Sequence, residues 1–227
     1  MIMRMSNFEN DIVVSDEYVR VLEIEDKKLF INIVQSIHGL CYNKEGTEYI
    51  VLLDGDRQVD FAKDVYFIID ALNLDLNDRK ILSKLYLKMK NLLELEHKIQ
   101  LDSYLKEALD LINTVFIEFP FELTYKSEIQ VEDFLKLYGF RLYTQEESFM
   151  EQMLYLIDLI SLLGLCKVLI FCNIKSFFTD EQIEEIYKYV VYNKLHVLLV
   201  EGNIAEELLP FEKKIRIDGD FEDYEIK

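Results

Sequence analysis

A run of basic residues lies in the stretch NDRKILSKLYLKMK of an otherwise acidic chain. Lys80, Lys84 and Lys88 are spaced i, i+4 and i+8, so a helix would place them on one face, with Arg79 and Lys90 nearby. No acidic residue lies between Arg79 and Lys90. The pattern favours a solvated face of an amphipathic helix, and contact with phosphate groups is the functional alternative.

A group of acids follows in the stretch IEFPFELTYKSEIQVED. It contains Glu118, Glu122, Glu128, Glu132 and Asp133. Calcium takes about six to eight oxygen ligands, and a loop together with the following helix can supply several carboxylates. The spacing is not that of an EF-hand, so these residues taken alone favour exposed, solvated acids over a calcium site.

Motifs for nucleotide binding and for hydrolysis are absent from the sequence. None of the seven glycines lies in a GxxxxGK[ST] or GxGxxG pattern. Glu201 ends an apolar run and could hold magnesium, although a solvated residue at the rim of a sheet is the favoured interpretation. The three histidines and three cysteines show no zinc spacing or nucleophile signature, and we expect reduced, structural thiols.

The elements that must position these residues include a βαβ unit near the C-terminus. Residues 167–172 and 195–200 are apolar runs, and Thr179 with Gln182 forms a capping box that opens a helix between them. Continuous apolar runs are typical of strands buried in a parallel sheet. Further strands are predicted over residues 11–14, 18–24 and 48–54, and a helix over residues 25–40.

The character of the chain changes at about residue 60, because residues 60–113 contain no Pro or Gly and repeat Leu and Ile. Asn77 or Asp78 is expected to cap a helix within this stretch. An irregular or edge strand is predicted over residues 116–125, followed by a helix ended by Gly139 and a strand at 140–143. A helix is then predicted over 146–163, and a strand at 213–218 before a frayed acidic tail. We therefore expect a discontinuous α/β head (residues 1–59 and 144–227) and a mainly helical leg (residues 60–143).

Composition and charge limit the class of protein. Hydrophobic residues make up 51% of the chain and charged residues 30%, which indicates a folded globular protein. No apolar run approaches the roughly 20 residues that cross a bilayer, and residues 1–14 do not follow the pattern of a secretion signal, so we expect a cytoplasmic location without a membrane partner. The net charge of −18 argues against DNA binding by the surface as a whole. A DNA-binding function would need a local basic face or bound divalent cations.

Four stretches together resemble the Csn2 family, the DNA-binding adaptation proteins of type II-A CRISPR systems. They are VLEIEDKKLFINIVQSI, LLDGDRQVDFAKDVYFIIDALNLDLND, EDFLKLYGFRLYTQEESFMEQML and KVLIFCNIKSFFTDEQIEEIYKYVVYNKLHVLLVEGN. The resemblance implies a P-loop-NTPase-like α/β head that lacks nucleotide motifs, with an inserted α-helical leg. It also implies a noncatalytic, calcium-binding homotetrameric ring that binds double-stranded DNA ends during spacer acquisition, alongside the integrase subunits and the effector nuclease.

The resemblance carries over to individual residues only in part. It places the calcium ligands at about Glu118–Asp133, which we call the acidic segment. Within this segment, Glu122 and Glu128 occupy acidic family positions. Thr124, Lys126 and Ser127 stand where relatives can carry acids, which implies weaker calcium binding or none. For DNA, the family uses lysines that face the hole of the ring, and the lysines of the NDRKILSKLYLKMK stretch are the local candidates.

Two other functions remain open from the residues. One is an ATPase or nuclease that uses an atypical site around Glu201 or around Asp54 and Asp56. The other is an acidic scaffold that binds only protein partners. The missing phosphate-binding loop counts against the ATPase or nuclease. The aligned lysines count modestly against the protein-binding scaffold.

Overall fold

The computed structural model describes residues 1–6, 8–44, 49–124, 129–143 and 148–226. Its contacts divide the chain into two compact units. The head consists of Met1–Asp75 together with Gln145–Lys227, and the leg consists of Leu76–Thr144. Among the described residues, no helix has the length and apolar character that crossing a membrane requires.

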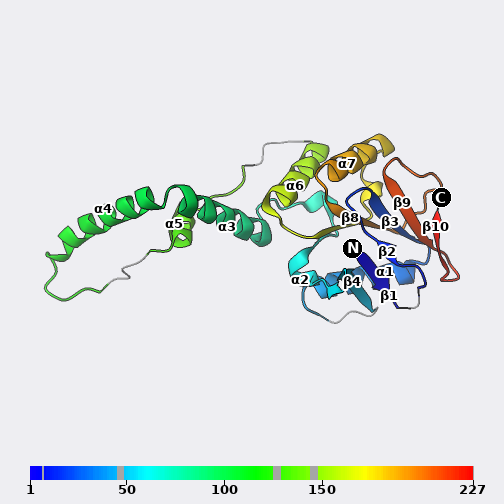
Figure 1. Ribbon diagram of the computed structural model, residues 1–227, viewed down its shortest axis with the longest axis horizontal. Helices are drawn as coiled ribbons and strands as arrows, with labels where there is room; N and C mark the ends of the chain where they lie inside the picture. The colour runs from blue at the N-terminus through cyan, green and yellow to red at the C-terminus, as the bar shows by residue number, and fades with distance from the viewer. Residues whose placement is uncertain (7, 45–48, 125–128, 144–147, 227) are drawn as a thin grey trace. The chain divides into compact units, whose positions relative to one another are not determined.

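The head is built on a six-stranded, mostly parallel sheet (Figure 1). In spatial order its strands are β10 (Asp223–Ile226), β9 (Glu212–Ile217), β3 (Val19–Ile24), β8 (His196–Glu201), β7 (Val168–Cys172) and β6 (Val65–Ile68). Only β10 is antiparallel to its neighbour. Both faces of a parallel sheet must be covered, and here each face packs against other elements of the head. The predicted α/β fold is confirmed.

One face of this sheet packs against helix α1 (Lys27–Cys41) and a small antiparallel sheet. The small sheet contains β2 (Ile12–Val13), β1 (Ile2–Met5), β4 (Ile50–Asp54) and β5 (Arg57–Gln58), in that order. Leu29, Ile33 and Ile37 recur on one side of α1 and join the buried core cluster with Leu22 and Ile24 of β3. The short helix α2 (Phe61–Asp64) and the 3-10 turn η1 (Ala71–Asn73) flank β6.

The other face is covered by α6 (Phe149–Leu163) and α7 (Asp180–Tyr192), which pack on each other (Figure 1). Both helices begin with capping boxes: Ser148 with Glu151 in α6, and Thr179 with Gln182 in α7. Each box satisfies backbone N–H groups that have no partner within the helix. The predicted βαβ unit and its capping box are therefore confirmed, with the 3-10 turn η2 (Ile174–Ser176) added after β7.

The leg contains α3 (Arg79–Glu96), α4 (Lys98–Phe116) and α5 (Val131–Tyr138). Asp78, one of the two predicted caps, caps α3 by accepting a hydrogen bond from Ile81 N at 2.8 Å. Asn77 instead makes two hydrogen bonds to the backbone of Leu142. Gly139 ends α5 in the left-handed conformation at φ 60°, which confirms the predicted stop.

Four local predictions are wrong. Residues 65–68 form the edge strand β6 rather than a helix, and residues 60–75 belong to the head, so the leg begins at Leu76. Residues 140–143 form no strand, whereas residues 117–124 are irregular, which is one of the two alternatives predicted for residues 116–125. The C-terminal tail is not frayed, because it forms β10 against β9.

Side-chain contacts hold β10 in place. The Asp223 carboxylate accepts hydrogen bonds from the backbone N–H groups of Glu9 at 3.0 Å and Asn10 at 2.7 Å. Glu225 pairs with Arg20, whose guanidinium lies 2.9 Å away and whose side chain is buried. These partners are about 200 residues away in sequence, so no local pattern in the tail could predict them.

Candidate functional site

Helix α3 carries the predicted lysine face, which we define as Lys80, Lys84 and Lys88. The helix extends through all three positions, so their spacing places them along one side. All three side chains are half-buried. Lys90 follows Lys88 by two residues and therefore lies on roughly the opposite side of the helix. The structure thus supports an aligned set of three and separates Lys90 from it.

A shallow hollow runs along the N-terminal half of this face. Its lining includes Arg79, Lys80, Ser83, Lys84 and Leu87. Two of the three face lysines and the predicted Arg79 therefore border one surface depression. The surface of the hollow is almost wholly apolar, so the aliphatic stems of these side chains line it and the hollow itself is not a phosphate pocket.

The predicted calcium ligands are spread over two parts of the leg. Glu118 and Glu122 are exposed in the irregular segment after α4, whereas Glu132 and Asp133 lie in the first turn of α5. Glu128 lies outside the described residues. Within the described residues, no three acidic, histidine or cysteine side chains come close enough to share a metal ion. The described acids by themselves do not form a calcium site.

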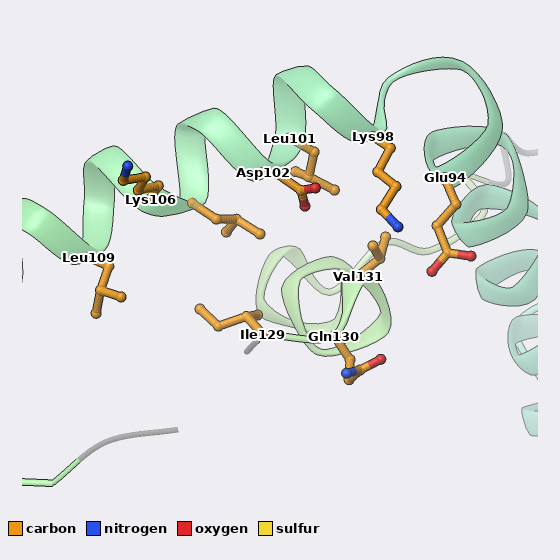
Figure 2. A pocket seen from close by; sticks show the side chains of 10 residues that line it. Glu94, Lys98, Leu101, Asp102, Lys106, Leu109, Ile129, Gln130 and Val131 are labelled. Atoms are coloured by element: carbon orange, nitrogen blue, oxygen red, sulfur yellow. The ribbon is translucent and has the colours of Figure 1, made fainter. Parts of the chain in front are cut away.

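A groove in the leg lies between α4 and the start of α5 (Figure 2). Its apolar lining is Leu101, Leu105, Leu109, Ile129 and Val131, and its polar lining is Glu94, Lys98, Asp102, Lys106 and Gln130. Two acids and two lysines alternate along the groove, so its charges balance. The groove therefore lacks the positive character that makes the lysine face a candidate for phosphate binding.

The head places Glu201 differently from the sequence prediction. Glu201 ends β8, but its side chain is fully buried rather than solvated at the rim. The acid lies on the face of the sheet that α7 covers, beside Glu23 of the adjacent strand. Burial raises the pKa of the Glu201 carboxyl to about 7. The alternative location for an enzymatic site, Asp54 with Asp56, is exposed at and just after the end of β4, in the other sheet.

Sequence reasoning missed a cluster of buried charges around Glu201. Its other members are Glu23 of β3, Glu212, Lys214 and Arg216 of β9, and Lys175 of η2. Lys214 Nζ lies 2.9 Å from Glu23 Oε1, and Arg216 contacts the other Glu23 oxygen at 2.9 Å. We call these six residues the ionic cluster. Its only sequence signal is the presence of charges inside the strands VRVLEI and EKKIRI.

A tyrosine and a cysteine border the ionic cluster. Tyr187 of α7 donates a hydrogen bond from its hydroxyl to Glu212 Oε2 at 2.9 Å. Burial, reinforced by Glu212, raises the pKa of Tyr187. Burial, reinforced by Glu201, raises the pKa of the Cys172 thiol to about 11, so this cysteine is a poor nucleophile. Cys41, Cys166 and Cys172 all lie outside disulfide bonds.

The sequence also matches a known protein family. The family model described as CRISPR-associated protein (Cas_Csn2) matches residues 42–221, which is most of the chain. The chain belongs to the Csn2 family. The matched region contains the lysine face, the acidic segment and every member of the ionic cluster except Glu23.

Two curated Csn2-family relatives are similar over most of their length. The CRISPR-associated protein Csn2 of Enterococcus faecalis is 22% identical over 84% of this chain and 85% of its own. The CRISPR-associated protein Csn2 of Streptococcus agalactiae is 22% identical over 80% of each chain. These descriptions give the Csn2 family a CRISPR association and name no reaction.

A comparison with solved structures gives a more distant similarity. A protein described as an ABC transporter ATP-binding protein from Pyrococcus furiosus has a TM-score of 0.43 and 8% identity, covering 94% of this chain and 97% of its own.

Proposed function

We propose that this protein is a noncatalytic homotetrameric ring that binds double-stranded DNA ends when CRISPR systems acquire new spacers. Its partners would be the integrase subunits and the effector nuclease. The observation that carries the proposal is the lysine face on α3 in a chain of the Csn2 family. Lysines aligned along a helix suit phosphate contacts that read no base sequence.

A ring would answer the objection from net charge. The chain carries −18, yet Arg79 and the lysine face form a stretch of α3 without an acid. Symmetry would repeat that stretch around a central hole, while the acidic residues remain on the outer surface. Counterions released from the duplex would then contribute most of the affinity, and binding would fall steeply with salt.

Exposed apolar side chains on α4 support self-association. Tyr104, Leu111, Ile112 and Val115 recur at helical spacing, and each is more than half exposed in the single chain. A contiguous apolar surface of this kind marks an interaction site in a folded protein. We infer that subunits associate through the leg, and that calcium bound by the acidic segment would relieve carboxylate repulsion between them.

The ring predicts a preference for DNA that has ends. Linear duplex can thread a closed ring, whereas a covalently closed circle of the same sequence cannot. In a competition gel shift, we expect the linear form to compete at least about tenfold better than the circle. Equal competition would exclude threading, and absence of DNA retention at low salt would favour the protein-binding scaffold.

Calcium removal tests the metal separately from DNA. We expect a tetramer in gel filtration with light scattering when calcium is present, and a smaller species after a chelator is added. A tetramer that persists in chelator would refute the calcium requirement and leave the ring intact. A monomer under both conditions would refute the ring itself.

A further inference from the structure

The connection between β8 and β9 is unusual for parallel strands. Two parallel strands need a crossover that returns to the starting edge of the sheet, and a helix usually supplies it. Here residues 202–211 make the return without a helix. We call these ten residues the crossover. Because a helix is absent, their backbone polar groups need partners from elsewhere in the fold.

The ionic cluster supplies those partners. Lys214 Nζ donates hydrogen bonds to Ala205 O at 2.7 Å and Glu207 O at 3.1 Å, and Arg216 donates to Ala205 O at 2.9 Å. Ala205 N in turn donates to Glu23 Oε1 at 3.1 Å. Buried charges therefore hold the crossover on the sheet.

Among the described residues, Glu201 is the one acid of the ionic cluster that forms no close ion pair, although Lys175 is near enough to attract its charge. Glu23 is paired with Lys214 and Arg216, and Glu212 is paired with Lys175 Nζ at 2.6 Å. Glu201 Oε1 accepts a long hydrogen bond, 3.3 Å, from the backbone N–H of Lys175, and the backbone N–H of Ile174 also donates to this carboxyl group. Among the described residues, Glu201 Oε2 has no hydrogen-bond partner although it is buried.

A charge on Glu201 would be costly in these surroundings. Glu23 lies beside it in the strand register, and Glu212 adds a second acid nearby. Lys175, Lys214 and Arg216 face the same region but are already paired with those two acids. The remaining titratable neighbours are the Tyr187 hydroxyl from α7 and the Cys172 thiol from β7. An unpaired buried carboxylate binds a proton more readily than an exposed one.

We infer that Glu201 is a proton-binding site that keeps the crossover closed, and that loss of its proton to solvent opens the crossover. The added negative charge attracts the ammonium of Lys214 away from Ala205 O and Glu207 O. Opening also lets water solvate the new carboxylate. The proton is thus exchanged with water, and no other reactant takes part.

The direction of the pH effect follows from the two states. The pKa of Glu201 is about 7 when the crossover is closed, and 4.5 is the ordinary value for an exposed carboxyl. The closed state is therefore favoured at low pH and progressively loses that advantage as pH rises from 4.5 to 7. For full exposure on opening, the open-to-closed ratio rises about tenfold between pH 6 and pH 8.

Amide hydrogen exchange in the full-length chain tests this inference. The opening equilibrium of amides in residues 202–211 would be measured at pH 6 and pH 8, with rates corrected for intrinsic exchange. We expect about a tenfold increase in the wild type, the same increase in the matched surface variant Glu206→Gln, and no increase in Glu201→Gln. A wild type without the increase, or a Glu201→Gln variant that retains it, would overturn the inference.

A second measurement does not depend on the variant being folded. Carbon-13 NMR of the wild-type protein would follow ionisation of the Glu201 carboxyl directly. Titration near pH 7 is expected, whereas titration near 4.5, the ordinary value, would overturn the inference. Both measurements use the protein without DNA, so their outcomes do not depend on whether the protein forms the proposed DNA-binding ring.

Discussion

Replacing Lys80, Lys84 and Lys88 together with glutamate is expected to weaken binding of linear duplex DNA by about a thousandfold. Each charge-assisted contact with a phosphate contributes roughly tenfold in affinity, and three such contacts would be lost. The slope of log affinity against log salt should also fall by about 3, because each lost phosphate contact removes about 0.9. Fluorescence anisotropy titrations over a range of salt concentrations would measure both quantities.

A charge-matched control separates the lysine face from net charge. The triple variant Lys98→Glu, Lys106→Glu and Lys136→Glu makes the same change at three exposed lysines of the leg. We expect only a small loss of affinity in this variant, since α3 is unaltered. Equal losses in the two triple variants would show that overall charge governs binding, and an unchanged affinity in the first would remove the lysine face from the DNA site.

Replacing Lys214 with methionine is expected to lower the free energy of unfolding of the head by about 3–5 kcal/mol. The Lys214 side chain is fully buried, and its ammonium contacts Glu23 and Glu212. Methionine keeps much of the volume but removes one donor each from Glu23, Ala205 O and Glu207 O. Removing one partner of a buried ionic group is costly because the remaining charge stays desolvated. Urea denaturation followed by circular dichroism would measure the change.

Lys213 provides the matched control for this prediction. It is the preceding residue of β9, is exposed, and lies over the Tyr18 ring at 4.0 Å. Lys213→Met should change stability by a small amount, because water solvates the groups it leaves behind. If Lys214→Met proved no more destabilising than Lys213→Met, the ionic cluster would not hold the crossover as described.

The ionic cluster also bears on the enzymatic alternative. In open α/β sheets, ligands bind beyond the carboxyl ends of the parallel strands. In this head, Glu23 and Glu201 lie at the carboxyl ends of β3 and β8, but both are fully buried. Glu23 holds the crossover by accepting a hydrogen bond from Ala205 N, whereas metal-assisted hydrolysis at Glu201 would require access by a phosphate group.

The lysine face and the helix caps could be predicted from sequence because they are local. A spacing of four residues places Lys80, Lys84 and Lys88 on one side of any helix. In the same way, Thr179 and Gln182 can form a capping box without contacts from elsewhere. The chain alone therefore determined the main candidate for DNA contact and most elements that frame the head.

Tertiary structure decided which strands the sheet recruits and which charges it buries. Residues 65–68 continue a helix-like apolar pattern, yet they pair with β7 and become a strand. β10 forms only because β9, Asn10 and Arg20 supply partners from distant parts of the chain. Glu201 follows an apolar run, and the sequence of that run is compatible with either a solvated or a buried side chain at its last residue. Its burial depends on α7 and the crossover, which local sequence cannot reveal, because desolvation is a property of the packed fold.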